Sequence, residues 1–325
     1  MEKRFRWGII GASSIANKFC DAISGMEGCV ITAIGSRSLQ RAQVFAENNH
    51  IDAAYGSYEE MLDKERPDAV YIAVVTGEHY NACMLCLKYR IPFLCEKTMC
   101  VNSAQVRDIF MRAEQEKIFC MEAMWCRFLP IVKKAKRWCS DGKIGDIKYV
   151  DASLGFCALK DENNRFWNKK LGGGASYDLL VYGYEIIRFL IEEPIKKQSF
   201  SQVMSRSGVD ASDLLILYYD DKFAVIRASF ETCFSQGISI NGEKGKVEIP
   251  DLLFGNKVIC TQFENGHTEE YTDEKIGNGF VYEIEEVMTC IAEGKLESET
   301  VSHELTLEFA EICDEIQNGN GECKA

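Results

Sequence analysis

The first 123 residues alternate short apolar runs with amphipathic helical patterns, and this alternation constrains the fold more than any other feature. The apolar runs are "FRWGIIG", "VITAIGS", "DAVYIAVV", "PFLCEK" and "IFCMEA". The helical patterns between them cover residues 15–26, 39–48, 57–64, 79–89 and 103–116. Apolar strands separated by helices predict a parallel sheet that is covered by helices on both faces.

Beyond residue 123 the regular alternation of apolar runs and helical patterns ends. Helical patterns over 130–140 and from about Asp178 are followed by short alternating runs between 195 and 263, with a hairpin turn expected at 243–245. Two helical patterns close the chain, "GFVYEIEEVMTCIAEG" and "SHELTLEFAEICDEIQNG". We therefore predict an α/β chain of two domains. Residues 1–123 form the parallel-sheet domain, and residues 124–325 form an α+β domain with a large, mostly antiparallel, open sheet.

Charge and cysteine usage narrow the choice of partner and compartment. The net charge of −13 and pI of about 5.0 argue against nucleic acid or an anionic membrane surface as a partner, so we expect a small molecule. No apolar run approaches the roughly 20 residues that cross a bilayer, and no signal-peptide core follows the N-terminus. The fifteen cysteines, an odd number scattered through apolar runs, indicate reduced thiols and a cytoplasmic location.

The first strand leads into "GIIGASSIA", residues 8–16, which has the features of a phosphate-binding turn. Gly11 and Ala16 meet two of the three small-residue positions of a dinucleotide site, whereas Ser13 replaces the middle glycine. The motif alone also fits an ordinary strand–helix connection. Its place after the first strand, at a helix N-terminus, favours cofactor binding. The candidate cofactor contacts are Gly11, Ala12, Ser13, Ser14 and Ile15.

The second strand ends at Ser36-Arg37-Ser38, where an NAD-selective site would carry an acidic residue. Hydroxyls and a guanidinium suit a ribose 2′-phosphate instead, so we expect NADP to be preferred over NAD. The alternative is a solvated arginine at the start of a helix.

The strand "IPFLC" stops abruptly at Glu96 and Lys97. Burying an unpaired charge costs several kcal/mol, but ligands of open parallel sheets bind at the carboxyl ends of the strands. We therefore place both residues at the site. Lys97 can hydrogen-bond a ribose hydroxyl and a substrate hydroxyl, and its charge stabilises a developing alkoxide. The same dipeptide also ends many strands that have no catalytic role.

Taken together, these motifs resemble those of the glucose–fructose oxidoreductase/inositol dehydrogenase (Gfo/Idh/MocA) family, in the branch with dihydrodiol and xylose dehydrogenases. The similar segments are "WGIIGASSIA", "AYGSYEEML", "LCEKTMCVN", "MEAMWCRFLP" and "GGGASYDLLVY". They extend over nearly the whole chain. The resemblance implies an NAD(P)-binding Rossmann domain and a substrate-binding and dimerisation domain. It also implies hydride transfer between nicotinamide and a secondary alcohol of a sugar or cyclic diol.

Roles follow position by position from this resemblance. Lys97 matches the catalytic lysine, Asp178 the aspartate at the helix entry, and Tyr182 the acid/base residue one turn later. Because a phenol ordinarily has a pKa of about 10, base catalysis near neutrality requires a nearby positive charge, which Lys97 would supply. Thr76, His79 and Glu96 are further cofactor contacts. The predicted substrate contacts are Trp125, Arg127, Phe128, Arg165 and Trp167.

Three positions depart from the family pattern: Thr98 replaces a proline, Leu180 a glycine and Thr76 an asparagine. They leave the substrate open. Two rival functions also remain, an NAD-dependent glycosidase of the same family and a non-catalytic nucleotide or sugar sensor. Retention of Lys97 and Tyr182 argues against the sensor. We expect a homodimer or higher homo-oligomer. We expect no metal, because the C-x-x-C of residues 83–86 reads as an apolar helix face.

Overall fold

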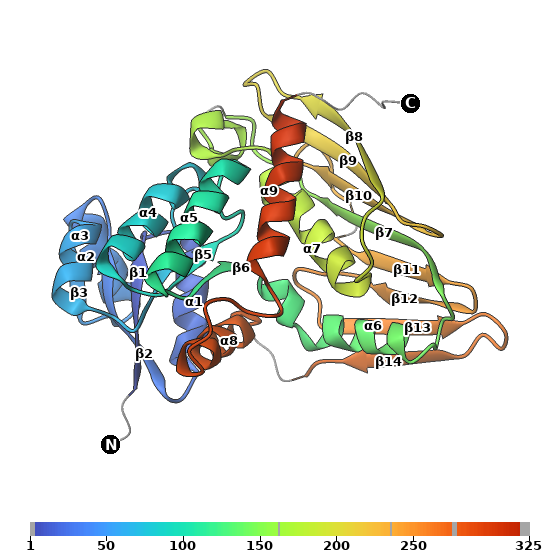
Figure 1. The fold of residues 1–325 in the computed structure, drawn as a ribbon, viewed down its shortest axis with the longest axis horizontal. Coiled ribbons are helices and arrows are strands. Elements are labelled where there is room, and N and C mark those ends of the chain that lie inside the picture. Colours follow the sequence, from blue (N-terminus) through green and yellow to red (C-terminus); the bar gives the residue numbers. More distant parts are fainter. Residues whose placement is uncertain (1–3, 162, 235, 275–277, 319–325) are drawn as a thin grey trace. The chain divides into compact units, whose positions relative to one another are not determined.

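The computed structural model describes residues 4–161, 163–234, 236–274 and 278–318. The chain packs into two compact units (Figure 1). One contains the residues up to Trp125 together with Asn278–Ala310, and the other contains the rest of the chain. None of the helices in the described ranges is long and apolar enough to cross a membrane.

The first unit is built on a six-stranded sheet in which every strand pair is parallel, in the order β3-β2-β1-β4-β5-β6. Its strands are β1 (Phe5–Ile10), β2 (Cys29–Gly35), β3 (Ala53–Tyr55), β4 (Ala69–Ile72), β5 (Phe93–Glu96) and β6 (Cys120–Ala123). The connecting helices are α1 (Ser14–Ser24), α2 (Leu39–Asn48), α3 (Tyr58–Glu65), α4 (Thr76–Tyr89) and α5 (Ser103–Glu116). Helix α8 (Phe280–Ala292) packs beside α1. The predicted parallel sheet is confirmed.

Aromatic and sulfur-containing side chains fill the core of this sheet. Phe19 of α1 stacks on Tyr71 of β4 with ring centroids 4.0 Å apart, and Trp7 of β1 meets Phe19 edge-on at 5.2 Å. On the helix side, Cys83 and Cys86 lie fully buried in the apolar cluster, as expected of small hydrophobic side chains. Strands β4, β5 and β6 are buried along their whole length, as expected of strands covered on both faces, whereas β3 is only partly buried.

The second unit contains an eight-stranded sheet in the order β14-β13-β12-β11-β7-β10-β9-β8. Its strands are β7 (Ile147–Gly155), β8 (Lys197–Met204), β9 (Asp210–Tyr218), β10 (Phe223–Ser229), β11 (Ile238–Gly242), β12 (Gly245–Ile249), β13 (Lys257–Gln262) and β14 (Thr268–Thr272). In this sheet of the described residues, only the inner pair β7 and β10 is parallel, and the other pairs are antiparallel. The predicted second sheet is therefore confirmed, as is the hairpin between β11 and β12.

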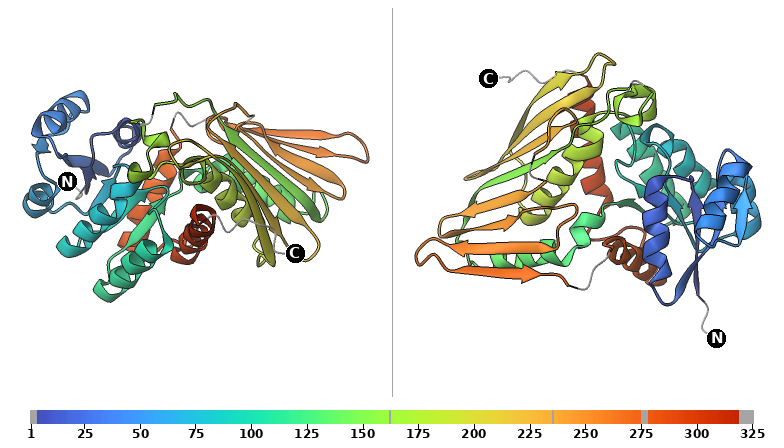
Figure 2. Two further views of the ribbon diagram at one scale, coloured as in Figure 1. Left: turned by 90° about the horizontal axis from the view of Figure 1, so that it is seen from above. Right: turned by 180° about the vertical axis from the view of Figure 1, so that it is seen from behind.

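Helices α6 (Pro130–Ser140) and α7 (Val181–Leu190) pack against this sheet (Figure 2). Short helical turns connect the elements: η1 (Trp125–Phe128), η2 (Arg165–Trp167), η3 (Lys169–Leu171) and the π-helical turn η4 (Ser176–Leu180). Helix α7 approaches the strands very closely at Gly183. A Cβ there would lie 2.5 Å from Cγ2 of Ile226 on β10, so only glycine permits this packing.

Helix α9 (His303–Gln317) belongs to both units, because the division falls after Ala310. Helix α8 belongs to the first unit, although it follows the second unit in the sequence. A single boundary between residues 123 and 124 therefore does not describe this part of the chain. That boundary stays a prediction of where the two functions separate.

Candidate active site

The turn after β1 depends on glycine at position 11. Gly11 has a φ of 106°, and a Cβ there would lie 2.5 Å from the carbonyl oxygen of Ala73. Any other residue would be strained and would push β1 and the segment after β4 apart. The chain can therefore cross the carboxyl end of the sheet closely enough for a ligand to approach the main chain.

Ser13 explains how the turn works without the middle glycine. It is the N-cap of α1, where its Oγ accepts a hydrogen bond from the N–H of Ala16 at 3.4 Å. Ala12, Ser13 and Ile15 are partly exposed and Ser14 is exposed. The first turn of α1 thus offers main-chain N–H groups and hydroxyls at a helix N-terminus, which suits a pyrophosphate.

Two arginines meet at the end of β2, and only one of them was predicted. Ser36 is buried and Arg37 is exposed. Arg41, one turn further along α2, donates from Nη2 to the carbonyl oxygen of Ala12 at 3.1 Å, so it joins α2 to the turn after β1. Burial raises the pKa of Tyr58, and the charges of Arg37 and Arg41 both oppose that rise. Arg41 follows Arg37 by four positions in the sequence, but Arg37 precedes Ser38, the N-cap of α2, so this spacing does not place the two side chains on one helix face.

The charged end of β5 is held in place by buried partners. The Tyr71 hydroxyl donates to Oε1 of Glu96, whose side chain is nearly fully buried. Burial raises the pKa of the Glu96 carboxyl, while the Tyr71 hydrogen bond and the Lys97 charge oppose the rise. Lys97 follows directly and is partly exposed. Glu96 is thus a buried support for the strand end, and Lys97 is the residue that reaches out of it.

The main chain of Thr98 and Met99, which follow Lys97, is contacted by the side chains of His79 and Glu122. The buried ring of His79 lies between two main-chain oxygens, with Nδ1 3.0 Å from Thr98 O and Nε2 3.1 Å from Val74 O. Burial lowers the pKa of this imidazole. On the other side, Oε1 of Glu122 accepts from the N–H of Met99 at 2.7 Å.

These contacts indicate a structural role for His79, because both of its ring nitrogens face main-chain carbonyl oxygens. The histidine connects the start of α4 to the segment that carries Lys97. Thr76 opens α4 and is partly exposed. Direct cofactor contacts by Thr76 and His79 stay predictions.

In the second unit, α7 carries Tyr182 beside the close contact at Gly183. Tyr182 is 9% exposed. Because Gly183 lets the helix approach the Ile226 side chain closely, the residue next to Tyr182 lies directly on the sheet.

The entry to α7 joins Asp178 to the preceding loop. Arg165 donates from Nη1 to Oδ1 of Asp178 at 3.1 Å; its side chain is 51% exposed and that of Asp178 is 15% exposed. Trp167 is buried and donates from Nε1 to the carbonyl oxygen of Leu159 at 2.9 Å. Asp178 lies in the π-helical turn η4, so the helix begins slightly before the predicted start near Asp178.

The start of η4 is anchored by a carboxylate that the sequence analysis missed. Asp210, on β9, accepts from the N–H of Ser176 at 2.6 Å and from Nε2 of Gln317 at 2.7 Å. It also lies against Gly174, where a Cβ would be 2.5 Å from its Oδ1. No local pattern marks Asp210, because its partners lie far away in the chain.

The three aromatic and basic residues of η1 serve different purposes. Trp125, in the first unit, stacks on Phe280 with ring centroids 5.9 Å apart. Arg127, in the second, forms a buried ion pair with Glu185 of α7 at 2.8 Å, and Phe128 is buried. The Arg127 charge is therefore used to hold η1 to α7. Substrate contacts by these three residues stay predictions.

The predicted residues thus form two groups, each assembled within its own unit. The first unit gathers the turn after β1, the arginines after β2, and the Glu96–Lys97 segment at the carboxyl ends of its strands. The second gathers Asp178, Tyr182 and Arg165 around the start of α7. Among the described residues, no cluster of three or more His, Cys, Asp and Glu side chains could hold a metal ion.

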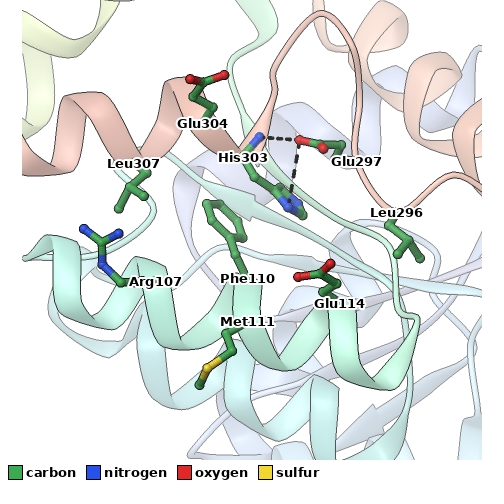
Figure 3. A pocket seen from close by; sticks show the side chains of 9 residues that line it. All are labelled: Arg107, Phe110, Met111, Glu114, Leu296, Glu297, His303, Glu304 and Leu307. Atoms are coloured by element: carbon green, nitrogen blue, oxygen red, sulfur yellow. Dashed lines mark hydrogen bonds and ion pairs between the residues drawn. The ribbon is translucent and has the colours of Figure 1, made fainter.

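A hollow of about 410 Å³ lies elsewhere on the first unit, between α5 and the start of α9 (Figure 3). His303 stacks on Phe110 there at 3.9 Å, and its Nε2 lies 2.9 Å from the carbonyl oxygen of Cys120. None of the predicted site residues lines it.

Comparison with known proteins assigns both parts of the chain. Residues 5–124 match the model of the oxidoreductase family with an NAD-binding Rossmann fold, and residues 132–248 match the GFO/IDH/MocA C-terminal domain. A trans-1,2-dihydrobenzene-1,2-diol dehydrogenase of Xenopus tropicalis is 32% identical over 322 residues, covering 95% of this chain and 96% of the relative.

Solved structures share the fold over the whole length. A levoglucosan dehydrogenase in complex with NADH and levoglucosan has a TM-score of 0.88 at 16% identity, with 98% of each chain covered. A 3-ketoreductase from Actinomadura kijaniata with NADP and TDP-benzene has a TM-score of 0.85 at 21% identity, covering 97% of this chain and 98% of the other. The chain belongs to the Gfo/Idh/MocA family of NAD(P)-dependent oxidoreductases, which confirms the family that its motifs indicated.

Proposed function

We propose that this chain is an NADP-preferring dehydrogenase that oxidises a secondary alcohol of a sugar or cyclic diol, with Tyr182 as the proton acceptor and Lys97 as its electrostatic partner. The main support for the proposal is that the residues beside Lys97 in the first unit, and beside Tyr182 in the second, make close packing or hydrogen-bond contacts. Lys97 is bracketed by the buried contacts of Glu96 and Thr98, and Tyr182 lies beside the Gly183 packing contact.

The residues of the first unit fit a dinucleotide phosphate. At position 11 there is no room for a side chain, because the main chain of Ala73 lies directly beside Gly11. The first turn of α1, which follows Gly11, presents main-chain N–H groups. Arg37 and Arg41 supply two positive charges at the end of β2, where the ribose lies in folds of this type. Guanidinium groups pair with phosphate through charge-assisted hydrogen bonds. Bound NADP would supply the acceptor for the hydride.

The chain's own part in the reaction is proton transfer and charge stabilisation. The Tyr182 oxygen accepts the proton of the substrate hydroxyl as the alcohol becomes a carbonyl. The Lys97 ammonium favours both the negative charge on the substrate oxygen and that on the phenol oxygen. Asp178 is a weaker candidate for the proton acceptor, because it is already paired with Arg165.

The substrate class is proposed from the relatives. The Xenopus relative is named for a trans-dihydrodiol of benzene and a structural neighbour binds levoglucosan, so both are ring compounds with secondary hydroxyls. We further propose a cytoplasmic homodimer or higher homo-oligomer, which the family resemblance supports.

The test is nicotinamide reduction with a panel of aldoses, anhydrosugars and trans-dihydrodiols, using NADP and NAD in parallel. We expect at least one member to reduce NADP at a rate that depends on Lys97 and Tyr182. Hydrolysis of a glycoside with no net change of nicotinamide absorbance would indicate the glycosidase. Tight cofactor binding without turnover on any member would indicate a sensor.

A further inference from the structure

Two exposed cysteines of the second unit face each other across neighbouring loops. Cys157 follows β7 and Cys233 follows β10, and their sulfur atoms lie 3.9 Å apart. Of the fourteen cysteines that the structure describes, these two alone are exposed; Cys139 is half-buried and the others are buried. We propose that Cys157 and Cys233 form a reversible disulfide, a modification site that joins the loop after β7 to the loop after β10.

Main-chain hydrogen bonds hold the two segments that carry the cysteines side by side. The parallel pairing of β7 and β10 continues past the strand ends, with the N–H of Phe156 bonded to Ser229 O at 3.0 Å and the N–H of Ala158 to Phe230 O at 2.9 Å. Cys157 lies between these two hydrogen bonds. A disulfide requires the sulfurs to close from 3.9 Å to about 2.05 Å, which rotation of two exposed side chains can supply.

The loop that carries Cys233 is equally fixed. A Cβ on Gly155 would lie 2.7 Å from the ring of Phe234 and 2.7 Å from the carbonyl oxygen of Thr232, so both neighbours of Cys233 pack directly against the end of β7. Lys160 and Glu231 form an ion pair at 2.8 Å between the same two loops. The encounter of the two thiols is therefore a result of the fold.

Reactivity separates this pair from the other thiols. Burial raises the pKa of Cys83, Cys86 and Cys120 well above the ordinary range, and buried thiols of this kind are chemically inert. Cys157 is fully exposed, and its pKa is raised chiefly by the hydrogen bond with Cys233. The Cys157 thiol is thus accessible but less ionised at neutral pH than an ordinary thiol, so its oxidation should be faster at pH 8 than at pH 7.

The oxidant is a low-molecular-weight disulfide such as oxidised glutathione. One protein thiolate attacks a sulfur of the small disulfide, forms a mixed disulfide and releases one small thiol. The second protein thiolate then attacks the protein sulfur of that mixed disulfide and releases the other small thiol. The two cysteines lose two protons and two electrons in total, and the small disulfide takes them up to become two thiols.

The linked loops adjoin the residues around Asp178. Phe156 and Phe166 pack with ring centroids 5.2 Å apart, and Phe166 precedes Trp167, whose indole is bonded to Leu159 O. The turn that contains Arg165, the ion-pair partner of Asp178, therefore contacts the chain on both sides of Cys157, through Phe156 and Leu159. A disulfide at Cys157 would restrict that segment.

The experiment equilibrates the folded full chain with glutathione buffers of increasing oxidised fraction, blocks free thiols with an alkylating agent, and measures intact mass and linked peptides. All chains carry Cys323→Ser, because that cysteine lies outside the described residues. We expect loss of both free thiols with a mass lower by two hydrogens, a linked peptide of Cys157 and Cys233, and reversal by dithiothreitol. The Cys157→Ser variant should instead hold one glutathione at Cys233.

Cys139→Ser is the matched control and should leave the linkage unchanged. Hydrogen exchange of the oxidised chain should slow in residues 156–161 relative to the reduced chain. One glutathione on each cysteine without an internal link, a link to any other cysteine, or unreacted thiols in the folded chain would overturn the proposal. These readouts do not involve turnover, so they are independent of the proposed function.

Discussion

Asp210 accepts a hydrogen bond from the main-chain N–H of Ser176 at 2.6 Å, although the two residues are 34 positions apart in the chain. Ser176 opens the π-helical turn that holds Asp178 and leads into α7. The carboxylate of Asp210 also accepts from Gln317 of α9 at 2.7 Å. The strand β9 thus sets where the helix of Tyr182 begins.

Removing this carboxylate should affect both stability and turnover. In Asp210→Ala, the buried N–H of Ser176 loses its acceptor, which costs about 1–3 kcal/mol of unfolding free energy. Because the start of the helix then shifts, we expect turnover to fall while cofactor affinity changes little. Urea unfolding, steady-state kinetics and nucleotide titration measure the three quantities.

Gln317→Ala is the control, because it removes the other donor to Asp210 and leaves the Ser176 contact intact. It should lower stability by a comparable amount with a smaller effect on turnover. Equal loss of turnover in both variants would mean that the Ser176 contact has no special role.

Asp213 predicts a pH effect on stability. Burial and the neighbouring Asp210 raise the pKa of its carboxyl well above the ordinary range. Neither oxygen has a hydrogen-bond donor among the described residues, whereas a protonated Asp213 can donate to Asp210. The folded state therefore binds a proton that the unfolded chain releases near pH 4. Each unit of pKa difference costs about 1.4 kcal/mol of unfolding free energy once the pH exceeds the folded-state pKa.

The sign of the effect follows from this difference. Wild-type stability should fall as pH rises above about 4, until the folded-state pKa is passed. Asp213→Asn keeps a neutral donor, so its stability relative to wild type should increase over the same pH range. Thermal unfolding from pH 4 to pH 8 checks this. A constant difference between the two proteins across the range would show that Asp213 is charged in both states.

The sequence predicted the elements well because their causes are local. Ser57 illustrates both the success and its limit: its Oγ accepts from the N–H of Glu60 at 3.1 Å, as a capping box requires. A capping box would also have the Glu60 carboxylate accept from the N–H of Ser57, but this carboxylate pairs with Lys64 at 2.7 Å. The i, i+4 ion pair competes for the same side chain.

The supports of the candidate site could not be predicted in the same way. Tyr71 meets Glu96 through the pairing of β4 with β5, and Asp210 meets Ser176 through the packing of η4 against β9. No short window of sequence contains both partners of either contact. Arg41 is an intermediate case. Its spacing from Arg37 was visible, but its contact with Ala12 depends on how α2 lies against the turn after β1.

Cofactor selectivity should depend on both arginines. We expect NADP to bind at least about tenfold more tightly than NAD, since a charge-assisted contact is worth about 1.5–3 kcal/mol. Arg37→Ala should weaken NADP and leave NAD nearly unchanged. Arg41→Ala should weaken both nucleotides, because Arg41 also braces the phosphate-binding turn. Titration by tryptophan fluorescence measures these affinities, and equal binding of NAD and NADP by wild type would contradict the assignment.

Lys97 should be required for turnover and dispensable for folding. Its side chain is partly exposed, whereas the structural contacts of this segment are made by Glu96, Thr98 and Met99. Lys97→Met should therefore reduce turnover by about two to four decades with little change in the unfolding midpoint. His79→Gln is the structural comparison, since it should lower the midpoint. Wild-type turnover in folded Lys97→Met would remove the lysine from the mechanism.

Tyr182 carries the mechanism. Its ring is nearly buried on a helix that Gly183 seats against β10, so Tyr182→Phe should keep the packing and remove only the hydroxyl. Cofactor affinity should stay unchanged while the hydride step slows by about two to four decades. The rate of wild-type alcohol oxidation should rise with pH as the proton acceptor loses its proton. Lys97→Met should move that rise to higher pH, because it removes the charge that favours the deprotonated form. Pre-steady-state nicotinamide reduction across pH, for wild type and both variants, measures this. If Tyr182→Phe reduces cofactor at the wild-type rate with an unchanged pH profile, another residue takes the proton, and Asp178 becomes the first to examine.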